Sequence, residues 1–203
     1  MEIVVLADGD VYDFLQTAGE NIKWKFAHTI ESFFESKNAD AYFDLRENAN
    51  EDYSSITKPL FINCMASTLA ENNHSKNVIR INAWPGFIET NMWEIAGYIS
   101  PEAAEVLNNL NKKYISVPDE AGLVSARIIA MIINEAYYAK DEDVSSEADI
   151  DIAMKLGTNY PYGPFEWCNK IGIDQVYNLL QKCSLTDERF LPSAGLALAN
   201  KIN

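Results

Sequence analysis

Residues 149–174 read D-I-D-I-A-M-K-L-G-T-N-Y-P-Y-G-P-F-E-W-C-N-K-I-G-I-D, and this stretch decides the C-terminal part of the fold. An amphipathic helical pattern runs to Gly157, and the turn-forming residues Pro161-Tyr162-Gly163-Pro164 follow it. A second helix is expected to start at Phe165. The stretch therefore predicts two helices joined by a tight loop.

The rest of residues 119–203 also reads as helix, which predicts a C-terminal domain made of helices. The run Leu123–Tyr138 is strongly apolar and predicts a buried central helix. Ser145 or Ser146 is expected to cap the next helix, because a serine hydroxyl accepts a hydrogen bond from a first-turn N–H and Asp149 suits that turn. Two further helices are expected at Gly172–Cys183 and Ser193–Lys201.

Residues 1–118 alternate short strands with short helices. This alternation predicts a first domain with a mostly parallel sheet in an α/β layer structure. The strands are expected at Glu2–Ala7, Ile22–Ala27, Ala39–Leu45, Pro59–Cys64 and Val78–Ala83. The helices are expected at Val11–Thr17, Thr29–Ser36, Thr68–Asn72 and Pro101–Lys113, the last with Ser100 as its N-cap.

Composition excludes several classes of function. The chain of 203 residues carries a formal net charge of −14, and no basic run occurs in it. Binding to nucleic acid or to an anionic membrane is disfavoured, because both need clustered Lys and Arg. No apolar run is long enough to span a bilayer. The hydrophobic fraction of 48% is enough for a folded core.

The cysteines and the N-terminus indicate an intracellular protein. Cys64, Cys168 and Cys183 are widely spaced and lack the spacing of metal ligands, so no metal site is predicted and the thiols are expected to be reduced. Met1 leads directly into a predicted strand without the pattern of a signal peptide. A cytoplasmic location is therefore expected.

The C-terminal motifs resemble one family, the 3-hydroxyacyl-CoA dehydrogenases. Within residues 149–174 the likeness lies in the acidic pair, Ala-Met-Lys-Leu-Gly, Pro-x-Gly-Pro-Phe and Gly-Ile-Asp. The resemblance implies a shortened Rossmann-like domain over residues 1–118, and a helical domain over residues 119–203 through which the protein forms a homodimer. Further matches are Gly122–Arg127 to Gly-Phe-x-x-Asn-Arg, Asn134–Ala136 to Asn-Glu-Ala, and Glu188–Pro192 to Arg-Tyr/Phe-x-Pro.

A fainter likeness extends into the first domain. The family moves a hydride between a nicotinamide cofactor and the 3-carbon of an acyl-CoA, using a His in His-Phe-Phe-Asn-Pro and a later Glu. Here only Ser67 and Glu94 match the family's site by residue type. A helix N-cap is the alternative for Ser67, and an ordinary strand residue is the alternative for Glu94. The matching segments are Ala39–Asp44, Ala66–Leu69 and Asn91–Ile95.

The catalytic position departs from the family pattern. The residue twelve positions before Glu94, where the family has its His, is Asn82. An amide cannot act as a general base near neutrality. The two histidines of the chain, His28 and His74, lie elsewhere in the sequence. Two further Asn residues of the family are replaced, at Pro85 and Ala126.

The cofactor loop departs as well. A dinucleotide fold places Gly-x-Gly-x-x-Gly after its first strand, but here Gly9 is the one glycine of the loop, between Asp8 and Asp10. These carboxylates would repel a pyrophosphate. The acidic residue that binds ribose is missing near His28 and Thr29, and residues 28–38 leave room for one short helix in place of the family's helical hairpin. No cofactor is therefore expected, with NAD as the cofactor if the protein is active.

Three readings follow. The first is a degenerate homologue with lost or impaired NAD-dependent hydride transfer, acting as a dimeric binding or structural protein. The second is an active 3-hydroxyacyl-CoA dehydrogenase with atypical site residues and an acyl-CoA-like ligand. The third sets the resemblance aside and assumes a small α/β protein with an unknown ligand in an apolar pocket lined by Trp84, Phe87, Met92 and Trp93.

Overall fold

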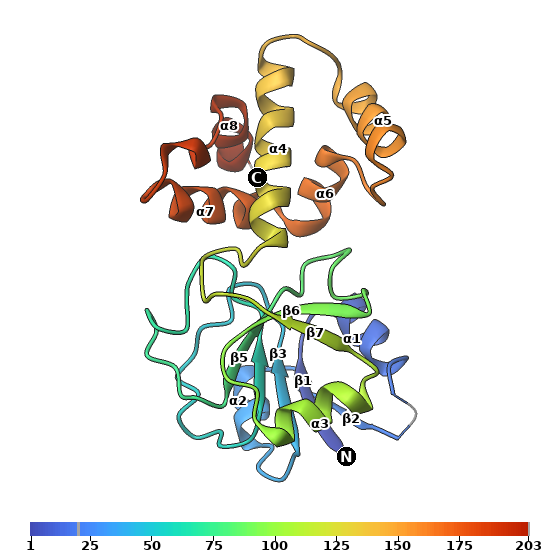
Figure 1. The fold of residues 1–203 in the computed structure, drawn as a ribbon, viewed down its shortest axis with the longest axis vertical. Helices are drawn as coiled ribbons and strands as arrows, with labels where there is room; N and C mark the ends of the chain where they lie inside the picture. The colour runs from blue at the N-terminus through green and yellow to red at the C-terminus, as the bar shows by residue number, and fades with distance from the viewer. Residues whose placement is uncertain (20, 203) are drawn as a thin grey trace. The chain divides into compact units, whose positions relative to one another are not determined.

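The computed structural model describes residues 1–19 and 21–202 and divides into two compact units (Figure 1). The first, here called the sheet unit, comprises Met1–Ala83 and Phe87–Leu123. The second, the helical unit, comprises Trp84–Gly86 and the chain from Val124 onward.

The sheet unit holds seven strands in the order β2-β1-β3-β4-β5-β6-β7. All neighbouring strands run parallel except β5 and β6, which are antiparallel. The predicted Rossmann-like, mostly parallel sheet followed by a helical region is therefore confirmed. The strands are β1 (Glu2–Leu6), β2 (Lys23–Phe26), β3 (Ala41–Asp44), β4 (Leu60–Ile62), β5 (Val78–Ile81), β6 (Met92–Ala96) and β7 (Lys113–Ser116).

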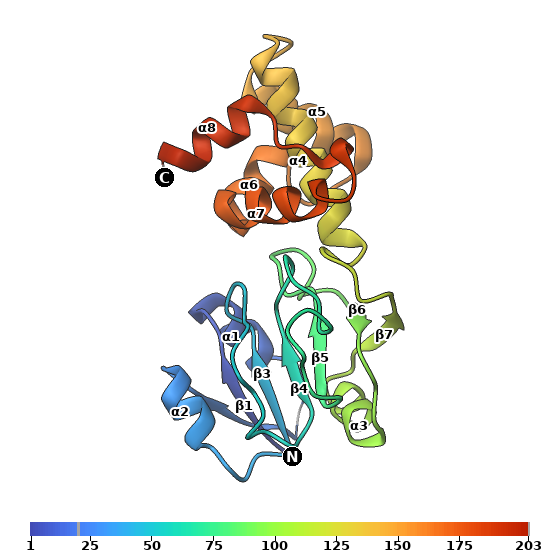
Figure 2. The ribbon, with the colours of Figure 1, turned by 90° about the vertical axis from the view of Figure 1, so that its left-hand side faces the viewer.

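Helices cover both faces of this sheet. Helices α1 (Gly9–Gln16) and α3 (Pro101–Asn109) pack on one face through Leu15 and Val106. Helix α2 (Ile30–Glu35) packs on the other face through Phe33, and Figure 2 shows α2 and α3 on opposite sides of the strands. Between β2 and β3 the chain forms this one short helix, as the sequence predicted.

The predicted helix at Thr68–Asn72 is wrong, because the segment forms turns. The Thr68 hydroxyl accepts a hydrogen bond from the N–H of Glu71 (3.1 Å), and the Glu71 carboxylate accepts one from the N–H of Thr68 (3.0 Å). Asn73 then takes a left-handed φ of 52°. The capping signal is real, but the chain turns away before a second helical turn can form.

The predicted helix Pro101–Lys113 is too long. Its cap is as expected, since the Ser100 hydroxyl accepts from the N–H of Ala103 (3.2 Å). The helix ends at Asn109, because Asn111 has a left-handed φ of 53°, and Lys113 then begins β7. The sequence analysis missed β7 because every one of its side chains is exposed, so no apolar alternation marks it.

The helical unit is built around α4 (Ser125–Asp141), which packs against α6, α7 and α8. The predicted helix is thus central, but it begins at Ser125 and is buried on one face only, since Ile128 and Tyr138 are exposed. Ser146 is the cap of α5, since its hydroxyl accepts from the N–H of Asp149 (3.2 Å). Residues 125–202 contain helices and no strand. The remaining helices are α5 (Glu147–Thr158), α6 (Pro164–Ile171), α7 (Ile173–Ser184), the 3-10 turn η1 (Glu188–Phe190) and α8 (Ala194–Ile202).

Asn134 explains why the Asn-Glu-Ala pattern matters for folding. This buried side chain on α4 donates to the carbonyl of Leu191 (2.9 Å) and accepts from the N–H of Ser193 (2.7 Å). One amide therefore satisfies two backbone groups of the segment that enters α8, and an amide is suited to this because it carries both a donor and an acceptor.

Asp151 plays a similar part between α5 and α6. Its carboxylate accepts from the N–H groups of Phe165 (2.8 Å) and Glu166 (3.2 Å), which are otherwise unpaired at the start of α6. A Cβ added to Gly163 would lie 2.3 Å from the Asp151 carboxylate. The glycine of the Pro-x-Gly-Pro turn is therefore required for space, since its φ of −77° is open to any residue.

We expect opposite effects from two glycine substitutions in this region. Gly163→Ala should destabilise the protein by about 2 kcal/mol, because its methyl group displaces the capping carboxylate. Gly157→Ala, the matched control in α5, should stabilise it by about 0.5–1 kcal/mol, since nothing lies within 4 Å of the added Cβ and alanine favours a helix. Urea unfolding measures both, and equal effects would contradict the role given to Asp151.

Candidate functional site at the carboxyl ends of the strands

The sheet has its switch point beside β1, which pairs with β2 on one side and β3 on the other. In open α/β sheets, ligands bind at such a point, outside the carboxyl ends of the strands. Asn63 and Asn82 directly follow β4 and β5 at this edge, and Asp8 follows β1 after Ala7. Asn63 and Asn82 are both buried.

Asn82 and Glu94 lie at neighbouring ends of the antiparallel strands β5 and β6. Arg80 lies opposite Ala96 and Ile81 opposite Ile95. Asn82 directly follows the last paired residue of β5, and Glu94 directly precedes its partner Ile95 in β6. The sequence likeness had paired these two positions by counting alone. Asn82 is 4% exposed and Glu94 is half-buried.

Ser67 lies in a bend of the loop that follows β4. It is not the helix N-cap that was considered as its alternative, because Thr68 provides the capping hydroxyl and no helix follows. Ser67 instead faces Cys64. Burial raises the pKa of the Cys64 thiol, while hydrogen bonds from Ser67 act in the opposite direction as smaller effects. This thiol is therefore protonated near neutrality and poorly suited as a nucleophile.

Asp8, Gly9 and Asp10 lie between β1 and the first turn of α1, where the sequence placed the cofactor loop of the family. Asp8 is the N-cap of α1 and Gly9 is its first residue, while Asp10 lies in its first turn. The start of a helix attracts anions, but two carboxylates already lie at this one. After β2, Thr29 caps α2 and His28 is exposed, with its ring 4.8 Å from that of Phe26.

At the end of β3 lies a partly buried ion pair that was not predicted from the sequence. The Asp44 carboxylate accepts two hydrogen bonds from the Arg46 guanidinium, at 2.9 and 2.7 Å, and one from the Tyr53 hydroxyl at 2.8 Å. Burial, with the charge of Asp44 as the next contribution, raises the pKa of Tyr53 above its usual value. The Asp-x-Arg spacing was the available signal, and the network fixes the loop that leaves β3.

A second missed network surrounds Arg80 in β5. Its fully buried guanidinium donates to the carbonyl of Cys64 (2.8 Å) and to the Asp119 carboxylate (2.6 Å). It also reaches the carbonyls of Met65 (3.4 Å) and Glu120 (3.2 Å). Arg80 therefore joins the loop after β4 to the segment after β7, and its role is structural.

The apolar pocket of the third reading is not formed as predicted. Trp84 and Trp93 are both buried. Trp93 packs in the sheet core, with its ring 6.4 Å from that of Phe43 and its indole N–H donating to the carbonyl of Ile88 (3.0 Å). Trp84 belongs to the other compact unit, and Met92 is exposed. A core position leaves no face of Trp93 for a ligand.

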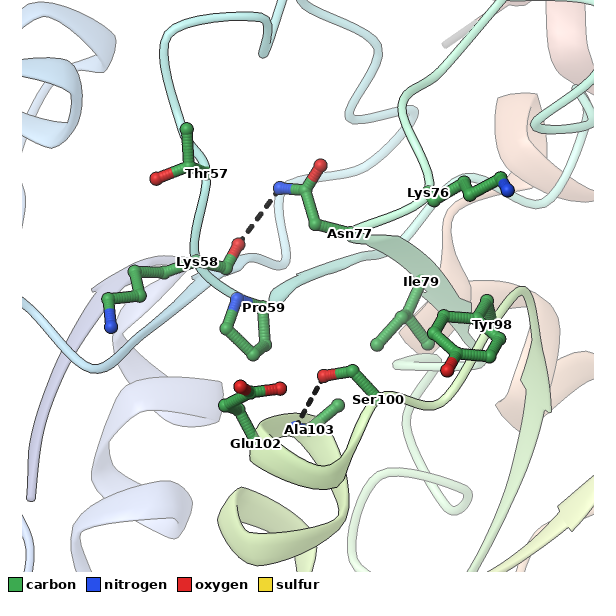
Figure 3. A pocket seen from close by; sticks show the side chains of 10 residues that line it. All are labelled: Thr57, Lys58, Pro59, Lys76, Asn77, Ile79, Tyr98, Ser100, Glu102 and Ala103. Atoms are coloured by element: carbon green, nitrogen blue, oxygen red, sulfur yellow. Dashed lines mark hydrogen bonds between the residues drawn. The ribbon is translucent and has the colours of Figure 1, made fainter.

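A cavity of about 360 Å³ lies at the opposite, amino ends of β4 and β5 (Figure 3). Asn77 spans its rim by donating to the carbonyl of Lys58 (2.9 Å). The pKa of Glu102 lies below its usual value, because the Ser100 hydroxyl and the Glu102 backbone donate to its carboxylate. This carboxylate already serves the start of α3, and Lys58 and Lys76 also line the cavity. Ser67, Asn82 and Glu94 do not line the cavity.

Two classes of feature are absent from the described part of the chain. Residues 1–19 and 21–202 contain no group of three or more His, Cys, Asp or Glu side chains placed to hold a metal ion. Among the same residues, no helix has the length and apolar character needed to cross a bilayer.

Comparison with known proteins points to one family. The model of the 3-hydroxyacyl-CoA dehydrogenase C-terminal domain matches residues 122–197. The chain is 36% identical over 117 residues to the 3-hydroxyadipyl-CoA dehydrogenase of Escherichia coli. That aligned region covers 49% of this chain and 25% of that protein. It is 38% identical over 76 residues to the 3-hydroxybutyryl-CoA dehydrogenase of Clostridioides difficile. That aligned region covers 37% of this chain and 27% of that protein.

Solved structures agree with this result. A 3-hydroxybutyryl-CoA dehydrogenase from E. coli K12 matches with a TM-score of 0.59 at 30% identity, over 70% of this chain and 31% of that one. The fold also matches (S)-3-hydroxybutyryl-CoA dehydrogenase from Ralstonia eutropha, with a TM-score of 0.69 at 16% identity, over 97% of this chain and 92% of that one. Residues 122–197 therefore match the C-terminal domain of the 3-hydroxyacyl-CoA dehydrogenases, and this match supports assigning the chain to that family.

Proposed function

We propose that this protein is a degenerate member of the family, in which NAD-dependent hydride transfer is lost or impaired, and that it acts as a dimeric binding or structural protein. The observation that carries the proposal is Asn82, which occupies the position of the family's histidine and directly follows β5, the strand that pairs with β6 and its Glu94. A carboxylate beside an imidazole can hold it as a base, but a carboxylate beside an amide cannot make that amide basic. An acyl-CoA-like molecule is the ligand class that the likeness suggests.

The start of α1 supports the same proposal. A pyrophosphate needs glycines that bring backbone N–H groups close, and this helix start offers Asp8, Gly9 and Asp10 instead. The chain also aligns with about a quarter of the length of the two curated relatives above, 25% and 27%. The activities printed for those proteins are therefore not carried over whole.

The proposal is tested by titrating NADH into the protein in a calorimeter. We expect binding weaker than a dissociation constant of about 10 μM, because the pyrophosphate meets two carboxylates. The double variant Asp8→Asn, Asp10→Asn is the matched control, and it should bind NADH more tightly than the natural chain if charge repulsion is the cause. A dissociation constant tighter than about 10 μM in the natural chain would overturn the proposal.

The alternative is an active NAD-dependent dehydrogenase with atypical site residues. Glu94 and Ser67 favour it, since they match the family's site by residue type. It also requires that the missing histidine and glycines be compensated elsewhere. A cytoplasmic location stays a prediction under either function.

The homodimer rests on an exposed apolar face of α4. Ile128 is 51% exposed, and it lies with Met131, Ile132 and Phe190 around a shallow hollow of about 370 Å³. These α4 positions recur at helical spacing, so they form one stripe. An exposed apolar stripe on a folded protein commonly marks an interface. We infer that a second copy of the chain covers this one.

The charges beside the stripe suit this partner. Arg127 and Glu135 border the same hollow, four residues before and four after Met131. In a two-fold dimer with antiparallel α4 helices, Met131 lies near the axis and Arg127 of one copy meets Glu135 of the other, twice. The arrangement is self-complementary, as a two-fold interface must be.

We expect Ile128→Asp to convert the dimer to a monomer, because it buries an unpaired charge at the centre of the interface. Light scattering at micromolar concentration measures the mass. Leu156→Asp is the control, since Leu156 is 83% exposed on α5 and outside the stripe. Arg127→Glu alone should weaken the dimer, and adding Glu135→Arg should restore it. A natural chain that is monomeric under these conditions would refute the proposed dimer.

A further inference from the structure

The loop that leads from β4 to β5 is irregular over residues 66–75, which form turns and bends but no helix or strand. Its contacts with the rest of the sheet unit include Leu69, which packs against the buried cluster on one face of the sheet. The N–H of Ala70 donates to the Asp119 carboxylate (3.2 Å), and the N–H of His74 donates to the carbonyl of Leu69 (3.0 Å). Irregular segments of this kind open at a lower free-energy cost than the strands beside them.

Two nitrogen atoms inside this loop are unpaired. Asn72 Nδ2 and His74 Nε2 have almost no accessible surface, and neither has a hydrogen-bond partner among the described residues. Buried polar atoms in native proteins are nearly always paired, so each of these two atoms raises the free energy of the closed loop seen in this structure. Opening of the loop lets water hydrate both atoms.

The charge of the His74 ring decides how large this cost is. A neutral imidazole carries a proton on one nitrogen only, whereas the charged ring carries a proton on both, so that Nε2 must then donate. In the closed loop Nε2 has neither an acceptor nor access to water, and a buried charge without hydrogen bonds is costly. Protonation of His74 therefore favours the open loop.

The charged groups around His74 come from three other parts of the sheet unit. Arg80 lies in β5, Asp119 follows β7, and Asp52 lies in the segment before β4. Burial, as the largest effect, lowers the pKa of His74; the charge of Arg80 acts in the same direction, and those of Asp119 and Asp52 oppose it. Asp119 is itself paired with Arg80 (2.6 Å), which limits its effect on the imidazole.

Tyr53 is a fixed and uncharged neighbour of His74. The two rings lie 5.6 Å apart, and the Tyr53 hydroxyl donates to the Asp44 carboxylate (2.8 Å). Burial raises the pKa of Tyr53, so the phenol stays protonated near neutral pH and brings no negative charge to the imidazole. Glu51, in the same segment as Tyr53, is paired with Arg46 (3.1 Å).

We propose that His74 is an acid-sensitive switch of this loop: a neutral ring keeps residues 66–75 closed, and a proton on the ring releases them together with Ser67. The closed loop has its full stability above about pH 6.5, the usual pKa of a hydrated imidazole. This stability is lost as the pH falls from there to the lower pKa of His74 in the closed loop, because the open loop binds the proton more tightly. The inference holds whether or not hydride transfer is lost.

Hydrogen exchange of the full chain from about pH 7.5 to about pH 5 tests the proposal, with mass spectrometry as the readout and correction for the intrinsic exchange rate at each pH. We expect protection of residues 66–75 to fall by up to about tenfold per pH unit below about pH 6.5, because opening binds at most one proton. Protection of the core strand β1 should change much less. Carboxyl groups, whose usual pKa values are about 4, stay charged over this range.

Two variants isolate the imidazole. His74→Phe keeps an aromatic ring beside Tyr53 but takes up no proton, so its loop should keep the same protection at every pH. His28→Gln is the control and should behave like the natural chain, since His28 lies after β2 and outside the loop. In the His28→Gln protein, NMR of the one remaining imidazole should show His74 titrating at lower pH than in the same protein unfolded by urea.

Three results would each overturn the proposal. The first is a His74 titration that is the same in the folded protein and in urea. The second is an equal loss of protection in the natural chain and in His74→Phe, which would assign the pH dependence to carboxyl groups. The third is an equal loss in residues 66–75 and in β1, which would mean that acid unfolds the whole sheet unit.

Discussion

Arg80→Met should lower the free energy of unfolding by about 3 kcal/mol or more, the largest stability effect that we expect in this chain. The substitution keeps an apolar stem of similar length but removes the guanidinium that binds Asp119 and Cys64. Breaking a buried pair by removing one partner typically costs about 3–5 kcal/mol, because the remaining groups stay buried without partners. Unfolding in urea, followed by tryptophan fluorescence, measures the change.

Arg189→Met is the matched control. Arg189 also pairs with a carboxylate, that of Asp187 at 2.6 Å, but its side chain is 77% exposed. Exposed pairs contribute about 0–1 kcal/mol, so this variant should unfold almost like the natural chain. Asp119→Asn should fall between the two, since its side chain is 26% exposed. Equal losses for Arg80→Met and Arg189→Met would show that the Arg80 network does not hold the sheet unit together.

The natural chain should reduce acetoacetyl-CoA with NADH at far less than about 1 per second, the lower end of ordinary enzyme rates. A positioned general base contributes about 10²–10⁴-fold, and Asn82 cannot supply it. Asn82→His should restore little of this rate, because Asp8 and Asp10 still oppose the pyrophosphate. Absorbance of NADH at saturating substrate measures all these rates.

Adding Asp8→Asn and Asp10→Asn to Asn82→His separates the two causes. If charge at the start of α1 limits the reaction, this triple variant should be faster than Asn82→His alone. A natural chain that turns over at about 1 per second or faster would end the proposal of a degenerate homologue. Ser67→Ala and Glu94→Gln would then be the first variants to make, since these residues match the family's site.

Local signals in the sequence were enough for much of the fold. The cap at Ser100, the cap at Ser145 or Ser146 and a helix start at Phe165, one residue after the observed start at Pro164, could be predicted, because each depends on residues within one turn. The five strands expected in residues 1–83 all form; β1, β3, β4 and β5 are short apolar runs typical of buried parallel strands, whereas β2 is an edge strand with alternating exposure. The family likeness was strongest in residues 149–174, which include Asp151 on α5 and its hydrogen-bond partner Phe165 on α6.

The tertiary structure decided what depends on residues distant in sequence. The bond between Arg80 and Asp119 joins positions 39 residues apart, so no spacing rule reveals it. The burial of Asp44 at the end of β3 depends on the packing around it, and β7 was not predicted because an exposed edge strand needs no apolar pattern. The sequence could count Asn82 and Glu94 as partners in a family motif, but only the antiparallel pairing of β5 and β6 places the two positions at neighbouring strand ends, because backbone hydrogen bonds between strands, rather than side-chain identity, fix which strands lie side by side.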